Sequence, residues 1–405
     1  MTSSYVKNQA VRSFYQVFIS GLDIKVTEFL QELFNVMIYS EFEQYLGRKK
    51  YERPKKFKYK EYMNGSRERT ILFKWSGILR IKIPRVRKGR FVPRIVFGNL
   101  TDPSVEKLLL QLWAQGCSYR DIKHLVGSLY GTDISTKLVN RIVNSVEKYV
   151  KQFHERQIEH KYECLYADAI CIKVKTREGK CSKAVVLELF GQRKCGKKII
   201  REMIDYMPAE AEDKISYTAF FKSLKRRGLK DDKINLIVHD DHAAISKAIK
   251  NVYGKSKIPQ QLCLVHKMRN VIAEVEHKVN IEPLKKRIWE VYSAKSKPAF
   301  LKLHKKLMKD YYEKETEAMK IFGKIDDKLL TRFDFPKLKT IDIKTNNPVE
   351  RFNRELKRRT RAVGCFESLQ SIDNLMFLII EYLNQCNGAS PTDPDLKFTH
   401  FLKRY

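Results

Sequence analysis

The sequence has few acidic residues and no long apolar run. Of its 405 residues, 47 are Asp or Glu and 80 are Lys or Arg, which gives a formal net charge of +33. A chain this basic repels itself unless it binds a polyanion, and nucleic acid is the commonest polyanion in cells. The longest apolar run, Leu375–Ile380, is far short of the roughly 20 residues that span a bilayer. We therefore expect a nucleic-acid partner and no membrane association.

The first residues and the cysteines also argue against export. Residues 1–7 open no apolar stretch like that of a signal peptide. The eight Cys are scattered and suggest no disulfide framework, so we expect reduced thiols and a cytoplasmic, nucleoid-associated protein. The pair Cys263 and His266 could be half of a zinc site, but a structural zinc site needs four ligands and no second pair has a suitable spacing. A packing role or a place in the wall of an active site is therefore favoured over zinc.

Residues 22–46 have the apolar spacing of a helix, which we expect to pack in a dimer or in a small N-terminal bundle. The next stretch, residues 48–94, contains eighteen Lys or Arg and only three acids, with aromatic residues between them. Its second half, residues 70–84, alternates around Ser76-Gly77 and predicts a β-hairpin. A solvated face is the alternative, but the density of charge favours contact with DNA phosphates. The candidate contacts are Arg80, Lys82, Arg85, Arg87 and Lys88.

Residues 104–115, 119–130 and 135–149 have helical patterns. Ser118 and Ser135 are suitable N-cap residues, and Gly131 would end the helix between them. This arrangement is typical of a helix-turn-helix, although an ordinary helical hairpin would give the same pattern. In a helix-turn-helix the second helix would face DNA. The side chains that it would present are Thr136, Lys137, Asn140 and Arg141.

From residue 162 the pattern changes to β-strands. Three β-rich runs (162–175, 183–191 and 198–206) are followed by a helix (213–227), a strand (234–238) and a helix (243–252). This is the element order of an RNase H-like fold. Asp168 interrupts the first strand and Asp240 ends the fourth, and these two strands are neighbours in such sheets. Alone, Asp168 could be a hydrogen-bonded strand residue and Asp240 a helix N-cap, and Asp241 competes with Asp240 for either role.

Between Asp240 and the next candidate acid, Glu350, lie more residues than one strand and one helix need. Residues 279–340 are Lys-rich and helical in pattern (283–294 and 299–323), so we expect an all-α insertion. The insertion could contact DNA, or it could be a solvated helical hairpin.

The segment of residues 345–361 predicts a helix with Asn347 as its N-cap and Pro348 at its first position. Glu350 follows Asn347 by three residues, and this spacing alone favours a capping box. The competing interpretation is a metal-binding carboxylate among cations that hold DNA phosphates. These cations are Arg351, Arg354, Lys357, Arg358 and Arg361.

Three carboxylates would suit phosphodiester chemistry. Cleavage and transesterification need charge stabilisation at the entering and leaving oxygens, which two Mg²⁺ ions about 3.5–4 Å apart can supply. Mg²⁺ prefers hard oxygen ligands and keeps some waters, so a few carboxylates suffice to hold it. We expect that Mn²⁺ could replace Mg²⁺. The sequence has no convincing nucleophilic triad based on Ser or Cys.

Taken together, these motifs resemble the prokaryotic insertion-sequence transposases of the Mutator-like group, which have a DDE catalytic triad. The resemblance covers nearly the whole chain. Its most specific part is Asn347–Arg361 followed by Val363-Gly364, and residues 166–169, 238–242, Cys263-x-x-His266 and 83–93 add to it. His239 and Phe352 depart from the family pattern, but neither is a proposed metal ligand.

The resemblance implies that Asp168, Asp240 and Glu350 are the triad and bind the metal ions, and that Cys263 and His266 shape the active site. It also implies binding of double-stranded DNA, both terminal inverted repeats and target, by a homodimer or higher oligomer. The rivals are an inactive DNA-binding regulator and an RNase H-like nuclease without strand transfer.

The expected fold is multidomain α+β: an N-terminal helical and helix-turn-helix DNA-binding region with a β-hairpin, and an RNase H-like α/β catalytic domain interrupted by an all-α insertion. The expected domains are an oligomerisation segment (1–47), a basic hairpin region (48–100), the helix-turn-helix (101–155), the catalytic domain in two parts (160–278 and 341–405, the second with C-terminal helices) and the insertion (279–340).

Overall fold

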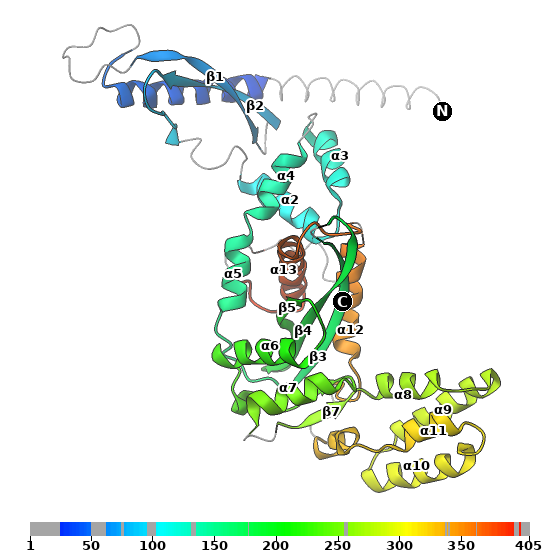
Figure 1. Ribbon diagram of the computed structural model, residues 1–405. Coiled ribbons are helices and arrows are strands. Elements are labelled where there is room, and N and C mark those ends of the chain that lie inside the picture. The colour runs from blue at the N-terminus through cyan, green and yellow to red at the C-terminus, as the bar shows by residue number, and fades with distance from the viewer. Residues whose placement is uncertain are drawn as a thin grey trace, which may run out of the picture. The chain divides into compact units, whose positions relative to one another are not determined.

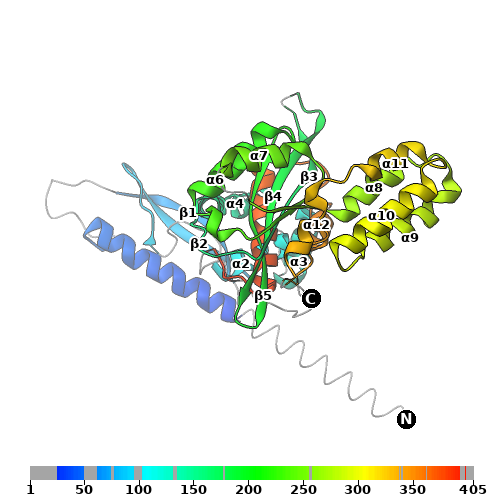
Figure 2. The ribbon, with the colours of Figure 1, turned by 90° about the horizontal axis from the view of Figure 1, so that it is seen from below.

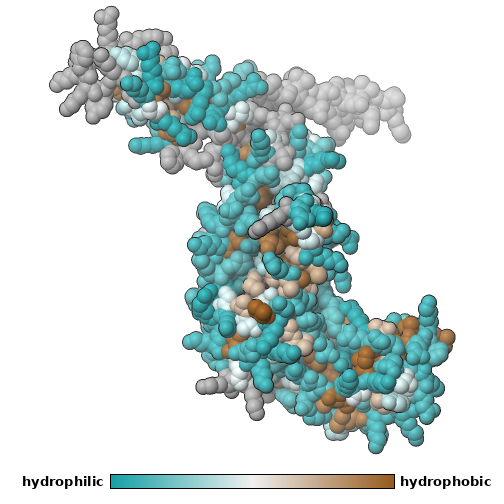
Figure 3. All heavy atoms as spheres, in the orientation of Figure 1, coloured by the Kyte–Doolittle hydropathy of each residue, from teal (hydrophilic) through white to brown (hydrophobic). Residues whose placement is uncertain are grey.

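The computed structural model describes residues 25–49, 62–73, 77–94, 103–130, 135–176, 178–254, 258–336, 338, 341–361, 363–392 and 397. The chain divides into two compact units (Figure 1). Unit 1 comprises Met1–Trp113 and Cys117–Ile142, and unit 2 comprises Ala114–Gly116 and Val143–Tyr405. The face shown in Figure 3 is mostly hydrophilic, in keeping with the high content of charged residues. Within the described parts, the structure has no helix that is both long and apolar enough to cross a membrane.

Unit 1 contains a helix over residues 25–46 and the hairpin of β1 (Met63–Phe73) and β2 (Gly77–Val86). Ile38 and Phe42 of the helix share a buried core with the hairpin's Leu79 and Ile81. The helix therefore packs against the hairpin, and the expected helical bundle is absent from the described part of this unit. Strand β1 begins at Met63, earlier than the expected residue 70. Ser76 of the predicted turn lies outside the described residues.

The helices of unit 1 are α2 (Pro103–Ala114), α3 (Tyr119–Tyr130) and α4 (Thr136–Asn144). Ser118 and Asp121 cap α3 reciprocally, since the Asp121 N–H donates to Ser118 Oγ at 3.2 Å and the Ser118 N–H donates to Asp121 Oδ2 at 2.8 Å. The Leu138 N–H donates to Ser135 Oγ at 3.2 Å. Both N-cap predictions are confirmed, whereas Gly131 lies outside the described residues. The single helix expected over 135–149 is wrong, because α4 ends at Asn144 and α5 (Glu147–Glu155) follows separately.

Unit 2 is built on a five-stranded mixed sheet in the order β5-β4-β3-β6-β7. Strands β3, β4 and β5 pair antiparallel, while β6 and β7 run parallel to β3. Strand β7 and the helix that follows it, α8 (Leu264–Ala273), were not predicted from the sequence. The strands are β3 (Cys164–Lys175), β4 (Cys181–Cys195), β5 (Lys198–Ala209), β6 (Ile237–His239) and β7 (Gln260–Leu262).

Helices cover both faces of this sheet (Figure 2). On one face, α6 (Lys214–Arg226) and α7 (Ala243–Tyr253) pack against Ala167, Leu187 and other side chains of the same parity. On the other face lie α12 (Asn347–Thr360) and α13 (Leu369–Cys386). There the ring of Phe352 lies 5.4 Å from that of Phe190. Asp168 has the parity of this second face.

A separate helical core follows β7, and Figures 1 and 2 both show its helices grouped at one side of the sheet. It consists of α8 (Leu264–Ala273), α9 (Ile281–Tyr292), α10 (Lys297–Tyr311) and α11 (Thr316–Gly323) around side chains such as Phe300. The single helix expected over 299–323 is wrong, because the chain turns between α10 and α11. At this turn the buried carboxylate of Glu315 accepts the Glu276 N–H at 2.8 Å. Short 3-10 turns occur at Asp231–Lys233, Lys278–Asn280, Asp327–Leu329 and Thr331–Asp334.

A buried ionic cluster fastens α5 to the sheet and to α13. His154 Nδ1 lies 2.7 Å from Asp205 Oδ1 and its Nε2 lies 3.1 Å from Asp373 Oδ1. Burial alone would lower the pKa of His154, but the two carboxylates outweigh it and raise that pKa to about 9. Arg227 also pairs with Asp205, so the cluster is held by charges of both signs.

Candidate functional site

Two of the expected acids follow directly after paired residues on neighbouring strands. Ala167 of β3 is the register partner of His239, the last residue of β6, so Asp168 is the next residue of β3 and Asp240 directly follows the end of β6. Adjacent strands are about 4.8 Å apart, which brings residues 72 positions apart in the sequence side by side. The order of the sheet therefore brings Asp168 and Asp240 near each other, and the charge of Asp240 acts on Asp168.

Asp240 and Asp241 have different surroundings. Asp240 Oδ1 accepts the His242 N–H at 3.2 Å in the turn between β6 and α7. The N-cap of α7 is His242, so the alternative of Asp240 as this cap is wrong. Asp241 Oδ2 instead accepts a hydrogen bond from Lys267 Nζ at 2.8 Å. Asp241 thus has a cationic partner.

Asp168 is held in an environment that disfavours its negative charge. Its Oδ1 accepts the Ala169 N–H at 3.0 Å, and its Oδ2 accepts from Asn353 Nδ2 of α12 at 3.4 Å. Burial raises the pKa of Asp168 to about 7, and the carboxylates of Asp240 and Glu350 add to this rise against the opposing Ala169 N–H. A bound cation would relieve this repulsion.

Glu350 lies in the first turn of α12, where its N–H donates to Asn346 O at 2.9 Å. The N-cap is Asn346, one residue earlier than expected, so the capping box with Asn347 is not formed. The carboxylate of Glu350 is turned towards α8 instead. Its Oε1 lies 3.4 Å from Arg269 Nη1 and 3.6 Å from His266 Nε2.

Asp168 and Glu350 share a cavity of about 540 Å³. Its acids come from β3 and the start of α12, and its cations come from the later turns of α12, from the residue that follows this helix and from α8. Of the cations predicted around Glu350, Arg351 is exposed but is not among the lining residues. The cavity is lined by Asp168, Ala169, Ile170, His266, Arg269, Glu350, Asn353, Arg354, Lys357, Arg358 and Arg361. Such a cavity can hold an anionic chain beside acidic side chains.

The other predicted contact residues belong to unit 1. Lys137, Asn140 and Arg141 are exposed on α4, and Thr136 is the first residue of that helix. The five basic candidates of the hairpin region are exposed on β2 and the turn after it, and they are Arg80, Lys82, Arg85, Arg87 and Lys88.

Cys263 and His266 lie where β7 passes into α8. Cys263 is buried, and its Sγ accepts the Asn346 N–H at 3.3 Å, which ties the start of α8 to the start of α12. Burial raises the pKa of Cys263 to about 11. His266 lines the cavity. Within the described parts of the chain, no three His, Cys, Asp or Glu side chains lie close enough to hold a metal ion.

The donor chemistry of the site nevertheless fits Mg²⁺. Asp168, Asp240 and Glu350 offer only carboxylate oxygens, the ligands that Mg²⁺ prefers. Burial is the main reason that the pKa of Asp168 is raised, and the negative charges of Asp240 and Glu350 add to the rise. The carboxylate of Glu350 contacts Arg269 and His266 rather than Asp168 or Asp240.

A fourth acid beside Asp168 was missed from the sequence. Glu188 of β4 is the register partner of Asp168, is fully buried, and forms no side-chain hydrogen bond with any described residue. Burial raises the pKa of Glu188 to about 8, Asp168 adds to this rise, and the nearby Asn353 amide opposes it. The available signal was an acid within the apolar run 184–190, the same signal that identified Asp168.

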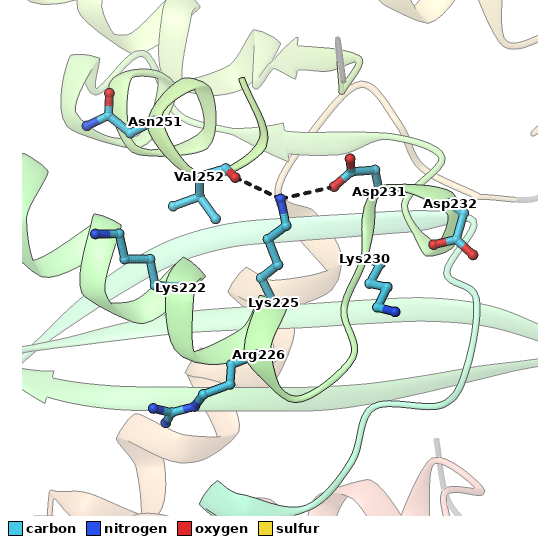
Figure 4. A pocket seen from close by; sticks show the side chains of 8 residues that line it. All are labelled: Lys222, Lys225, Arg226, Lys230, Asp231, Asp232, Asn251 and Val252. Atoms are coloured by element: carbon cyan, nitrogen blue, oxygen red, sulfur yellow. Dashed lines mark hydrogen bonds and ion pairs between the residues drawn. The ribbon is translucent and has the colours of Figure 1, made fainter. Parts of the chain in front are cut away.

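A second hollow, of about 660 Å³, lies between α6 and α7 and is strongly basic (Figure 4). In Figure 4, Lys225 points between Val252 and Asp231, with its Nζ donating to Val252 O at 2.9 Å and 3.6 Å from Asp231 Oδ1. The hollow contains none of the three candidate metal ligands. It can attract anions, but the predicted metal ligands lie elsewhere, so the Asp168 cavity remains the candidate site.

Comparison with known proteins points to one family. The family model described as "Transposase, Mutator family" matches residues 1–386. The chain is 29% identical over 369 residues to the transposase for insertion sequence element IS406 of Burkholderia multivorans, covering 90% of this chain and 92% of that protein. It is 25% identical to the transposase for insertion sequence element IS256 in transposon Tn4001 of Staphylococcus aureus, covering 87% and 88%.

Among solved structures, the Drosophila P element transposase strand transfer complex aligns with a TM-score of 0.30 and 10% identity, covering 74% of this chain and 80% of that one. A likeness this distant bears on neither the fold nor the function.

Proposed function

This chain belongs to the Mutator family of transposases, and from that premise we propose that it cuts DNA at the ends of its element and joins them to target DNA, with Asp168, Asp240 and Glu350 as metal ligands. The observation that carries the proposal is that Asp168 of β3 and Glu350 of α12 line one cavity, while Asp240 directly follows β6, the strand paired with β3.

The sheet supports an RNase H-like catalytic domain. Its first three strands are antiparallel, and the next two are parallel to the first and follow helices. This is the arrangement that the family resemblance implies. The helical core of α9, α10 and α11 interrupts the domain between Asp240 and Glu350, where we place the all-α insertion.

The cations of the cavity would bind DNA, and its acids would bind the metal ions. Arg354, Lys357 and Arg361 are exposed and line the cavity beyond Glu350, so they would bind phosphates on either side of the scissile bond. Bound Mg²⁺ would supply an activated oxygen nucleophile and stabilisation of the leaving 3′-oxygen. Mn²⁺ would replace it with the same oxygen ligands.

Movement of Glu350 would accompany loading of the site. In the structure, Arg269 Nη1 lies 3.4 Å and His266 Nε2 lies 3.6 Å from Glu350 Oε1. Cys263 holds the first turn of α12 by accepting the Asn346 N–H, so this turn would keep its place while the Glu350 side chain turns towards Asp168. Cys263 and His266 would thus shape the site without being metal ligands.

Unit 1 would recognise the terminal inverted repeats. Helices α3 and α4 have the order of a helix-turn-helix, and the exposed Lys137, Asn140 and Arg141 would face DNA from α4. The exposed cations of β2 would add contacts to phosphates that do not depend on sequence. A homodimer or a higher oligomer would bring two ends together.

The test uses the purified full-length protein, Mg²⁺, end-labelled DNA from the flanks of its own gene and a supercoiled target plasmid. Labelled ends joined to the plasmid, and lost with EDTA, would establish a transposase. Cleavage without joining would indicate a nuclease. Tight binding of the ends with neither reaction, in Mn²⁺ as well as Mg²⁺, would indicate a DNA-binding regulator and overturn the proposal.

A further inference from the structure

Two cysteines far apart in the sequence meet at the end of the β3–β4 hairpin. Cys181 is the first residue of β4, and Cys365 follows the last residue of α12 by five positions. Their Sγ atoms lie 2.7 Å apart, and both are free thiols. Cys181 is exposed and Cys365 is half-buried, so the pair is accessible from solvent.

The backbone around the pair explains why they meet. Phe366 adds a parallel bridge to Val174 near the end of β3. The Phe366 N–H donates to Lys173 O at 2.9 Å, and the Lys175 N–H donates to Phe366 O at 2.8 Å. Lys175 is also the cross-strand partner of Cys181. The end of β3 therefore pairs with Cys181 on one side and with Phe366, the neighbour of Cys365, on the other.

A cation accompanies the pair. Lys175 Nζ forms an ion pair with Glu367 Oε1 at 2.6 Å, and its charge favours the thiolate of Cys365. The neighbouring Cys181 thiol acts in the opposite direction and is the main reason that the pKa of Cys365 is raised. What suits the pair to thiol–disulfide exchange is the closeness of the two sulfurs and the exposure of Cys181.

We propose that Cys181 and Cys365 form a reversible intramolecular disulfide, a modification site whose oxidant is a low-molecular-weight disulfide such as oxidised glutathione. The exposed Cys181 loses its proton and attacks one sulfur of the oxidant, releasing one glutathione thiolate. The thiolate of Cys365 then attacks Cys181 Sγ in the mixed disulfide and releases the second. The two cysteines lose two protons and two electrons, and the oxidant becomes two glutathione thiols.

The bond would fasten the exit of α12 to the sheet. Arg361, which lines the catalytic cavity, precedes Cys365 by four residues, and Asp168 lies on the strand to which the bridge of Phe366 is attached. The disulfide would close a loop from residue 181 to residue 365 that contains Asp240 and Glu350. Restricting so long a loop in the unfolded chain stabilises the folded state. In a reducing cytoplasm the pair stays open, and it closes when the glutathione pool is oxidised.

The experiment treats the full-length protein with oxidised glutathione, blocks the remaining thiols, and maps disulfide peptides by mass spectrometry. We expect a peptide linking Cys181 to Cys365 in most monomers, reversed by dithiothreitol. We also expect the unfolding temperature to rise by roughly 5 °C on oxidation. Cys181→Ser and Cys365→Ser should each abolish both effects. Cys195→Ser, which removes an exposed thiol at the other end of β4, is the matched control and should leave both unchanged.

Two results would overturn the proposal. One is that Cys181 and Cys365 each carry only glutathione after treatment, with no link between them. The other is that the link forms between two chains, seen as a dimer on a non-reducing gel. Because the readout is a covalent bond, it is independent of whether the protein transposes DNA.

Discussion

Glu188 lies directly opposite Asp168 across β3 and β4, and both carboxyl groups face the side of the sheet covered by α12. Asp168 opens onto the cavity, whereas Glu188 is fully buried beside it. Replacing either acid with its amide removes its negative charge and keeps the shape of its side chain. Comparing the two substitutions therefore tells whether the site needs a particular carboxylate or only its negative charge.

Asp168→Asn should stabilise the protein in EDTA at pH 8. The folded pKa of about 7 lies above the ordinary value of 3.8 for an aspartic acid, so the folded state loses stability as the pH rises from about 4 to 7. The Asn variant escapes this loss, which we expect to be on the order of 2 kcal/mol. Its unfolding temperature should exceed that of the wild type at pH 8 and approach it near pH 4, measured by differential scanning fluorimetry.

The matched control is Asp241→Asn, which removes the ion pair with Lys267. This variant should unfold at a lower temperature than the wild type at pH 8. If Asp168→Asn also lowered the unfolding temperature, the crowding of carboxylates at the site would be contradicted.

Glu188→Gln should retain end cleavage within a few-fold of the wild type, while Asp168→Asn should abolish it. Glu188 does not line the cavity, so the neutral isostere changes little that touches DNA or metal. The measurement is the initial rate of cleavage of labelled ends in Mg²⁺. An equal loss of cleavage in both variants would place Glu188 among the metal ligands and contradict the different roles assigned to Glu188 and Asp168.

Replacing Arg354, Lys357 and Arg361 together with Ala should weaken DNA binding and flatten its salt dependence. Each lost phosphate contact removes about 0.9 from the slope of log K against log salt, so the slope should fall by up to about 3. Titrations at several salt concentrations measure it. The control replaces three of the four cations that line the second hollow, Lys222, Arg226 and Lys230, with Ala (Figure 4). An equal fall in slope with the control would mean that the cavity has no special part in binding.

The stability of unit 2 should decline as the pH rises from 7 through 9. His154 has its folded pKa raised to about 9 from 6.5, so the stabilisation is complete below pH 6.5 and is lost as His154 deprotonates. His154→Gln should remove on the order of 2 kcal/mol at pH 7 and flatten this decline. Chemical denaturation at pH 6.5 and 9.5 measures it. His160→Gln, at an exposed histidine, should keep the wild-type pH dependence.

The elements with a clear period were predictable from the sequence, and the short or interrupted ones were not. Helices α2 and α3 and strand β3 occur close to their expected positions because their apolar spacing extends over whole elements. The break between α10 and α11 depends on Glu315, whose partners are backbone groups after α8. No local pattern reveals a turn that is stabilised by residues about forty positions away.

In the site, too, features with a local sequence signal were predictable, and those set by distant contacts were not. An acid in an apolar strand marked Asp168, and the end of a strand marked Asp240, because both signals are local. The surroundings of Glu350 required α8 and α12 to meet, and that contact depends on Cys263 and Asn346. The spacing after Asn347 favoured a capping box because sequence alone could not show that the helix begins one residue earlier.

The most direct test of the catalytic proposal compares two substitutions on one helix. Glu350→Gln and Glu355→Gln both neutralise an acid of α12, but Glu355 is engaged with Arg358 and Arg359 and does not line the cavity. Joining of labelled ends to a target plasmid in Mg²⁺ is measured alongside binding of the ends. The account predicts that Glu350→Gln binds the ends as the wild type does but yields at least about 100-fold less joined product, which corresponds to about 2.7 kcal/mol, while Glu355→Gln retains joining. Joining by Glu350→Gln at the wild-type rate would contradict the assignment of Glu350 as the third catalytic acid.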